Sequence, residues 1–260
     1  MNHDLPFLPE RTSKPRQSGL TMMMDKGLSA REAENFVSSS VEYTDLVKFG
    51  FGTALITRQL EEKIRIYKEA GLIPYFGGTL FELFEIRGKF DEYMKFVERC
   101  HIETVEVSDG SMSMPHESKL EYIRILSSRF TVVSEVGSKV AGIEIPIDRW
   151  VEMMKTELEA GSWKVIGEAR ESGTIGIYQK DGTAHMDLVE AIVGKVGMDN
   201  VIWEAPIKNQ QAWFIHLLGS NVNLGNIAPG EVVALESLRL GLRGDTFFNF
   251  LPESFQDRML

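Results

Sequence analysis

Short runs of apolar residues recur along the chain, and polar side chains able to bind ions follow them. The runs cover residues 20–24, 46–47, 72–76, 104–107, 131–133, 164–166, 201–203 and 222–224. Their lengths are those of buried strands, whereas the segments between them have the period of surface helices. Strands that alternate with helices in this way predict parallel strands joined by right-handed crossovers. Eight such strands predict an α/β protein with a single (β/α)₈ TIM barrel.

The predicted helices lie between the apolar runs. They cover residues 30–39, 58–70, 90–100, 119–128, 149–160, 188–196, 210–218 and 232–240. In residues 58–70 the apolar side chains share one face, which is typical of a helix that covers a sheet. The main alternative is an open doubly wound sheet, which normally has fewer strands and a glycine-rich fingerprint after the first one. The Gly-Phe-Gly segment at 50–52 lacks the third glycine and follows the second run, so the barrel is favoured.

The chain length of 260 residues fits one barrel domain. Residues 1–16 contain three prolines and predict an irregular lead-in that packs over one end of the barrel or onto a neighbouring subunit. Residues 17–250 are assigned to the barrel and residues 251–260 to a C-terminal tail. A homo-oligomer is the expected assembly, because exposed barrel faces often associate.

Composition and charge narrow the classes of partner. Apolar residues make up 43% of the chain and charged residues 25%, as in ordinary soluble proteins. The net charge of -10 argues against a nucleic-acid surface but allows a local basic site for small anions. The single Cys100 favours a reducing, cytoplasmic setting. No apolar run resembles a signal peptide or approaches the roughly 18–20 residues that span a bilayer, so no membrane partner is expected.

Carboxylates, lysines and arginines are the expected catalytic groups. The five histidines lack ligand-like spacing, no G-x-S-x-G elbow is present, and no cysteine lies at a strand end. Asp109, Glu135, Glu168 and Glu204 follow the fourth to seventh strands. Because the carboxyl ends of barrel strands meet at one mouth, these residues predict oxygen ligands for a hard cation such as Mg²⁺. Which of the four bind the metal stays open at this point.

Four cationic side chains are expected near the same mouth: Lys26, Lys48, Lys139 and Arg170. The alternative for each is simple pairing with a nearby carboxylate, and for Lys139, two residues past Gly137, solvation on a loop. Charged groups beside apolar strands are costly to bury unless they are paired or functional. A functional role is therefore favoured for Lys48 and Arg170, while Lys26 is balanced between the two interpretations.

Two segments are candidate phosphate sites. One contains a glycine pair and follows the third strand, and the other contains glycine and asparagine and lies around the eighth. Such turns let a phosphate approach the main chain, and the loop after the eighth strand often binds phosphate in this fold. Glycine pairs also form ordinary strand-to-helix turns, so each segment alone is a weak indication. The candidate residues are Gly77, Gly78, Thr79, Ser220, Asn221, Gly225 and Asn226.

Longer blocks of sequence resemble the phosphosulfolactate synthase family. They are LTMMMDKGL at 20–28, VKFGFGT at 47–53, GGTLFE at 77–82, VEVSDGS at 105–111, EVGSK at 135–139, EARESG at 168–173, EAP at 204–206, NQQ at 209–211, NVNLGNIA at 221–228 and GLRGDTF at 241–247. The resemblance runs from about residue 17 to 248. Several blocks in one order, falling at strand ends, are far more specific than any single short motif.

The resemblance implies a carbon–sulfur lyase that adds sulfite to phosphoenolpyruvate with Mg²⁺, giving (2R)-phospho-3-sulfolactate, as in coenzyme M biosynthesis. Attack at the methylene carbon would push charge into the carboxylate as an aci-carboxylate, which a metal can stabilise and a lysine can protonate. Lys139 is the first candidate for this general acid and Lys48 the second. Lys26, Arg170 and Arg243 are candidates to hold the anionic reactants.

Three alternatives stay open. Arg243 has a second possible role, which is to clamp Asp245 and position the final loop. The reaction has a rival in a lyase or aldolase that acts on another phosphorylated carboxylate. The family also includes barrels linked with stress tolerance, for which a non-catalytic role is the alternative. The chain retains five charged residues together, which argues against a pure scaffold, because a scaffold has no physical need for buried charges. They are Lys48, Glu135, Lys139, Glu168 and Arg170.

Overall fold

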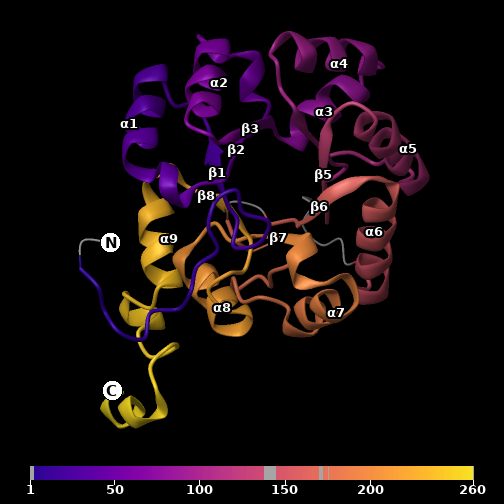
Figure 1. Cartoon of the computed structure of the whole chain (residues 1–260). Coiled ribbons are helices and arrows are strands. Elements are labelled where there is room, and N and C mark those ends of the chain that lie inside the picture. The colour runs from indigo at the N-terminus through magenta and orange to yellow at the C-terminus, as the bar shows by residue number, and fades with distance from the viewer. Residues whose placement is uncertain (1–2, 138–144, 170–171, 175, 260) are drawn as a thin grey trace.

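The computed structural model describes residues 3–137, 145–169, 172–174 and 176–259. Eight parallel strands close into a barrel in the order of the sequence (Figure 1). Their bounds are β1 (Thr21–Asp25), β2 (Leu46–Phe49), β3 (Ile73–Phe76), β4 (Thr104–Val107), β5 (Thr131–Val136), β6 (Ser162–Gly167), β7 (Val201–Glu204) and β8 (Leu224–Ile227). The prediction of a single (β/α)₈ barrel is confirmed.

The helices of the described chain surround this barrel (Figure 1). They are α1 (Ala30–Ser40), α2 (Leu60–Glu69), α3 (Gly78–Glu85), α4 (Phe90–Arg99), α5 (His116–Ser127), α6 (Ile147–Ala160), α7 (Met186–Val196), α8 (Lys208–Leu218) and α9 (Val232–Arg239). Eight correspond to predicted helices, and α3 was not predicted because it begins inside the glycine pair that indicated a turn. No helix among the described residues is long and apolar enough to cross a bilayer.

The eighth strand begins and ends later than the apolar run at 222–224 predicted. The side chain of Asn223, just before the strand, binds two neighbouring segments. Its Oδ1 accepts a hydrogen bond from the Leu20 amide, and its Nδ2 donates one to the Val201 carbonyl. The strand then continues through Gly225, where a Cβ atom would lie 2.5 Å from Cε of Met22. Glycine therefore meets a packing need inside the barrel here, and the prediction of a turn at this position was wrong.

The core has two layers separated by the sheet. The outer layer packs strand residues such as Met23, Val47 and Phe76 against the helices. The inner layer fills the barrel below its mouth with Leu20, Met22, Leu46, Tyr75, Val133, Ile166 and Ile202. We call these seven inner residues the apolar floor. The polar side chains that follow them on the same strands lie above this floor, at the mouth of the barrel.

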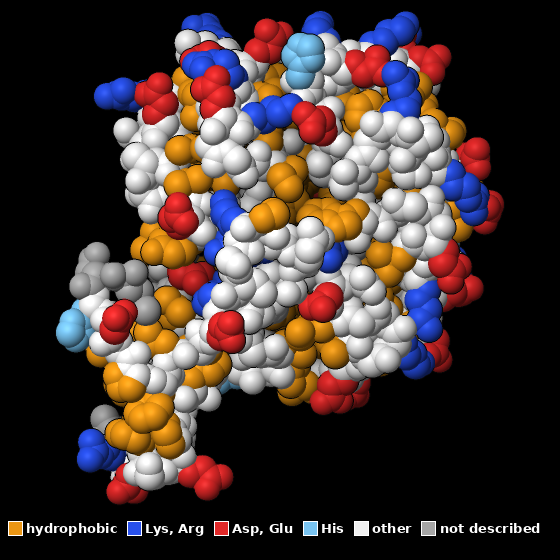
Figure 2. All heavy atoms as spheres, in the orientation of Figure 1, with side chains coloured by type: hydrophobic (Ala, Val, Ile, Leu, Met, Phe, Trp, Pro, Cys, Tyr) orange, Lys and Arg blue, Asp and Glu red, His pale blue; other side chains and the backbone are white. Residues whose placement is uncertain are grey.

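Charged residues close the amino-terminal end of the barrel, which the N-terminal segment crosses in Figure 1. Arg239 of α9 is fully buried and donates to the carbonyls of Ser220, Val222 and Leu20 at 2.7, 2.6 and 3.1 Å. Arg11 pairs with Glu236 at 2.9 Å. These contacts join the lead-in, α9 and the starts of β1 and β8. On the outer helices, acidic and basic side chains are interspersed (Figure 2).

Replacing Arg239 should destabilise the barrel strongly. Arg239→Met removes a buried donor from three carbonyls, of which Ser220 keeps Arg11 and Leu20 keeps the Leu224 amide, while the Val222 carbonyl loses its donor. We expect the free energy of unfolding to fall by roughly 2 kcal/mol or more. Arg124→Met is the matched control, because Arg124 is an exposed helix residue whose partners are also exposed, and it should unfold close to wild type. Urea denaturation of both variants measures the difference. Equal midpoints for the two would contradict a role for Arg239 in closing the barrel.

Candidate active site

Lys48 lies at the centre of a buried group of charges. It belongs to β2, where Leu46 packs inside the barrel and Val47 packs outside, so alternation directs Lys48 inward. Its Nζ atom lies 3.0 Å from Oε1 of Glu106, 3.2 Å from Oε2 of Glu135 and 3.3 Å from Oε1 of Glu204.

The balance of charge fixes the protonation state of Lys48. Burial by itself would lower the pKa of the ammonium, but the surrounding carboxylates outweigh it and raise the pKa above its ordinary value. Lys48 is therefore positively charged inside the barrel. Its charge compensates carboxylates that the apolar floor would otherwise make costly to ionise.

Three carboxylates form a cluster at the mouth. Glu135 lies near the end of β5, Glu168 directly follows β6, and Glu204 ends β7. Each is at most 2% exposed, and one oxygen from each lies within 4.8 Å of the others. Glutamate oxygens in such a buried group are the donors that a hard divalent cation prefers. We call these three residues the acidic triad.

Backbone and side-chain donors hold Glu204 in place. Its Oε2 accepts from the Ala169 amide at 3.0 Å and from Nδ2 of Asn226 at 3.5 Å. Its carbonyl accepts from the hydroxyl of Tyr178 at 2.7 Å. Asn226 has a φ of 57°, a conformation that asparagine tolerates better than most residues and that coincides with the irregular pairing of β1 and β8. The loop after β6 and the end of β8 thus meet at this carboxylate.

A cavity of about 470 Å³ opens above the triad. Lys48 and the triad form part of its wall, together with Gly77, Thr79 and Asn226. Its volume is in the range of small-molecule sites. The structure thus brings Lys48, three of the four predicted acidic residues and two of the predicted phosphate turns to one opening.

Comparison with known proteins assigns the chain to a family. The family model described as (2R)-phospho-3-sulfolactate synthase (ComA) matches residues 9–245. The chain belongs to the phosphosulfolactate synthase family. It is 42% identical over 244 residues to the phosphosulfolactate synthase of Bacillus subtilis, covering 93% of this chain and 97% of that protein. It is 44% identical over 237 residues to that of Methanocaldococcus jannaschii, covering 89% and 94%.

A solved structure with much lower sequence identity shares the fold of this family member. A crystal structure of 3-hexulose-6-phosphate synthase covers 84% of this chain and 98% of its own, with a TM-score of 0.52 and 16% identity. That similarity concerns the barrel alone. The predicted resemblance to phosphosulfolactate synthases is confirmed by the family model and the two relatives.

Glu106 was missed in the sequence analysis of this family member. It lies within β4 and is fully buried, and it contacts Lys48 more closely than either triad residue does. The apolar run at 104–107 was interpreted as a plain strand, although a charged residue inside such a run was the available signal. An acidic residue at a barrel-facing position needs a cation beside it, and Lys48 was already a candidate.

Asp109 lies apart from the triad, contrary to the expectation that it would join a single acidic arc. Its Oδ1 pairs at 2.9 Å with Nζ of Lys119, a buried residue of α5. Lys119 also pairs with Glu157 at 2.9 Å and donates to the Glu135 carbonyl at 2.6 Å. Within the described residues, Asp109 therefore neutralises a structural lysine that anchors the end of β5.

Three residues predicted to bind the substrate lie elsewhere or have another partner. Ser220 and Asn221 precede β8 and contact Arg11 at the amino-terminal end, away from the cavity. The sequence analysis grouped them with the mouth although they precede the eighth apolar run, and residues before a strand lie at the opposite end of the barrel. Arg243 lies 3.6 Å from Asp245 through its Nε, which is the clamp considered as its alternative role.

Lys26 remains at the mouth. Its Nζ lies 5.8 Å from the ring centroid of Phe51, which lines the cavity, and burial lowers the pKa of this lysine. Lys139 and Arg170 lie outside the described residues. Their assignment from the sequence therefore stays a prediction.

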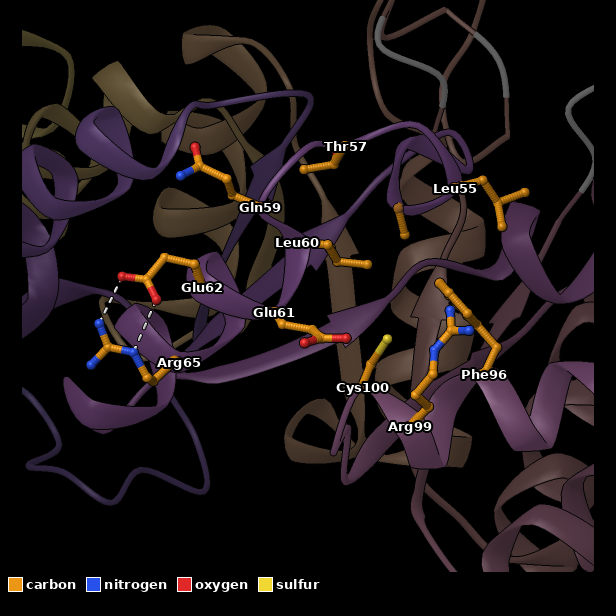
Figure 3. A pocket seen from close by; sticks show the side chains of 11 residues that line it. Leu55, Thr57, Gln59, Leu60, Glu61, Glu62, Arg65, Phe96, Arg99 and Cys100 are labelled. Atoms are coloured by element: carbon orange, nitrogen blue, oxygen red, sulfur yellow. Dashed lines mark hydrogen bonds and ion pairs between the residues drawn. The ribbon is translucent and has the colours of Figure 1, made fainter.

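A larger hollow, of about 750 Å³, lies on the outer surface between α2 and α4 (Figure 3). Both arginines that line it already have partners: Arg65 pairs with Glu62 at 2.7 Å, and Arg99 stacks on the Phe96 ring at 5.0 Å. The thiol of Cys100 faces this hollow, and burial raises its pKa, so it is a poor nucleophile. Size alone does not make this hollow the active site.

Glu204 should make the metal-free protein less stable as the pH rises. Burial, reinforced by Glu135 and opposed by Lys48, raises the pKa of Glu204 to about 7 from 4.5. The folded state therefore binds more protons than the unfolded state between these values, and the free energy of unfolding contributed by Glu204 falls as pH rises from about 5 to 7. Glu204→Gln should remove that part of the slope.

Urea unfolding in the presence of a chelator, at a series of pH values, measures the effect of Glu204→Gln. The difference between wild type and variant isolates this residue from the other titrating groups. A variant whose stability declines with pH as steeply as wild type would show that Glu204 is ionised in the folded state throughout this range.

Proposed function

We propose that this protein is a phosphosulfolactate synthase that adds sulfite to phosphoenolpyruvate and yields (2R)-phospho-3-sulfolactate. Support comes from its family and from relatives with that name at 42% and 44% identity over most of both chains. The structural observation that carries the proposal is the buried group of Lys48 with the acidic triad beneath one cavity. Such a group suits a reaction that concentrates negative charge at one place.

The proposed reaction has two steps. The sulfur of sulfite forms a bond to the methylene carbon of phosphoenolpyruvate, and the electron pair of the carbon–carbon double bond moves into the carboxylate as an aci-carboxylate. A proton then adds to the carbon that bears the phosphate, and the carboxylate is restored. No oxidant or reductant is needed, and the carbon–oxygen bond to phosphate stays intact.

The acidic triad is the proposed site of Mg²⁺. Glu135, Glu168 and Glu204 fit this ion because they offer closely spaced carboxylate oxygens from three rigid strand ends. When bound, Mg²⁺ supplies a fixed divalent charge that stabilises the negative charge developing on the substrate. Lys48 contributes a second fixed positive charge below the triad, and the apolar floor beneath it excludes water.

A lysine is the proposed proton donor, with Lys139 first and Lys48 second. The raised pKa of Lys48, caused by its carboxylate partners, suits a group that holds its proton. Lys139 is therefore preferred for delivery of the proton to the carbon. Lys26 and Arg170 are proposed to hold the anionic ends of the two reactants, because two anions that must meet need several cations around them.

The proposed phosphate contacts lie at the start of α3 and at the end of β8. Gly77 and Thr79 line the cavity at the amino-terminal end of α3, where backbone amides and the helix dipole favour an anion. The Gly78 amide already donates to Glu106, so it is occupied by that carboxylate. Asn226 of β8 lines the same cavity, and Gly225 precedes it in that strand.

Product analysis tests the proposed reaction. Purified protein with phosphoenolpyruvate, sulfite and Mg²⁺ should yield phosphosulfolactate, detected by ³¹P NMR and mass spectrometry. Lys139→Ala should lower kcat by about a hundredfold or more, the usual contribution of a positioned general acid. Lys195→Ala, at an exposed lysine paired with Asp148, is the matched control and should retain full activity.

Four results would count against parts of the proposal. A sulfonate-free reaction would reject it, and turnover of another phosphorylated carboxylate would favour a related lyase or aldolase. Failure of Mg²⁺ and phosphoenolpyruvate to raise the melting temperature would favour a non-catalytic barrel. Full activity in Lys139→Ala would move the role of proton donor to Lys48.

A further inference from the structure

Glu106 lies one layer deeper in the barrel than the acidic triad. In the pairing of β4 with β5, Glu106 is level with Val133, a residue of the apolar floor. Glu135 follows two positions later on β5, at the next inward-facing position. Lys48 thus has one carboxylate partner at floor level and two, Glu135 and Glu204, at the mouth.

A single oxygen of Glu106 joins two elements of the site. Its Oε1 accepts from the Gly78 amide at 2.6 Å and lies 3.0 Å from Nζ of Lys48. The helix α3 can approach this closely only because position 78 has no side chain: a Cβ there would lie 2.9 Å from the same oxygen and 2.2 Å from Oγ of Ser108. The first amide of α3 is thereby fixed to the carboxylate that holds Lys48.

The two upper partners of Lys48 are also members of the triad. The ammonium and a divalent cation therefore compete for Glu135 and Glu204. Glu106, which lies deeper than Glu135 and outside the triad, attracts the ammonium away from the two upper carboxylates and offsets part of its charge. The competition of Lys48 for the triad oxygens is thereby weakened. Charges this close and this well shielded from water interact strongly.

We propose that Glu106 is a positioning residue that holds Lys48 beneath the acidic triad and thereby keeps the triad open to a divalent cation. The proposal rests on the proposed function for the identity of the cation, but it concerns binding in the absence of any substrate. The competing explanation is that Glu106 only fixes the start of α3 through the Gly78 amide. The two differ in whether the loss of the Glu106 charge acts through Lys48.

Glu106→Gln separates these explanations because glutamine keeps an oxygen acceptor for the Gly78 amide and loses only the charge. Titration of the full chain with Mn²⁺, and then with Mg²⁺, by isothermal calorimetry gives the affinity without substrate. We expect Glu106→Gln to bind about tenfold more weakly, the usual scale for loss of a partner behind a metal ligand. A melting curve of each metal-free variant reports structural damage separately.

Glu82→Gln is the matched control. Glu82 is a buried carboxylate of the same helix α3, and it accepts a hydrogen bond from Ser108 rather than from Lys48. Its loss should change the melting temperature at most and leave Mn²⁺ affinity within about twofold of wild type. Equal losses of affinity in Glu82→Gln and Glu106→Gln would mean that any buried charge near α3 has the same effect, which overturns the proposal.

A double-mutant cycle shows whether the effect passes through Lys48. Lys48→Met removes the competitor and should bind Mn²⁺ at least as tightly as wild type. Adding Glu106→Gln to Lys48→Met should then change the affinity by less than about twofold. The proposal is overturned if the full tenfold loss persists in the double variant, if Lys48→Met binds no metal, or if wild type itself binds none.

The metal-binding measurements test the role of Glu106 separately from the proposed reaction with sulfite. Wild type that binds Mn²⁺ with the expected coupling, yet forms no sulfonate, would reject the proposed function and leave the role of Glu106 intact. If wild type forms sulfonate while Glu106→Gln binds metal as tightly as wild type, the proposed function stands and the role of Glu106 is rejected.

Discussion

The structure of the mouth depends on one buried ammonium group, that of Lys48. Carboxylates from β4, β5 and β7 lie close together at and above the apolar inner layer of the barrel. Without a cation, their mutual repulsion would favour their protonated forms. Contacts of 3.0 to 3.3 Å to Glu106, Glu135 and Glu204 compensate that repulsion with one side chain. The raised pKa of Lys48 follows from the same contacts. Lys48 compensates only part of this repulsion, since the pKa of Glu204 is still raised to about 7. The group therefore keeps an excess of carboxylates, which suits a divalent cation.

The two ends of the barrel use charge differently. At the amino-terminal end, Arg239 and Arg11 saturate strand carbonyls and Glu236, so their charges are absorbed by the fold. At the carboxyl-terminal end, the triad carboxylates border an open cavity. This division is the common one for the fold, in which one end provides stability and the other provides chemistry. Burial of a charged side chain therefore does not by itself mark a functional residue in this chain, because Arg239 is as deeply buried as the triad and serves the fold.

The fold and half of the site were predictable because they depend on periodicity. Apolar runs ending in Lys48, Glu135, Glu168 and Glu204 indicated both the strands and their converging ends. What failed depended on side-chain contacts that no local pattern shows. Asp109 pairs with Lys119 of the next helix, and the side chain of Asn223 binds the Leu20 amide of another strand segment. Glu106 was missed because a single charge inside an apolar run gives no sign of its partner, which lies on another strand.

The position of a divalent cation tests the central claim most directly. Crystals of the protein soaked with Mn²⁺ give an anomalous peak at the metal, which locates the ion independently of any substrate or assay. The account predicts a peak bounded by Glu135, Glu168 and Glu204, with Lys48 still in contact with Glu106 below it. A peak coordinated by Asp109, or a triad that holds no metal while Lys48 stays paired with Glu135 and Glu204, would contradict it.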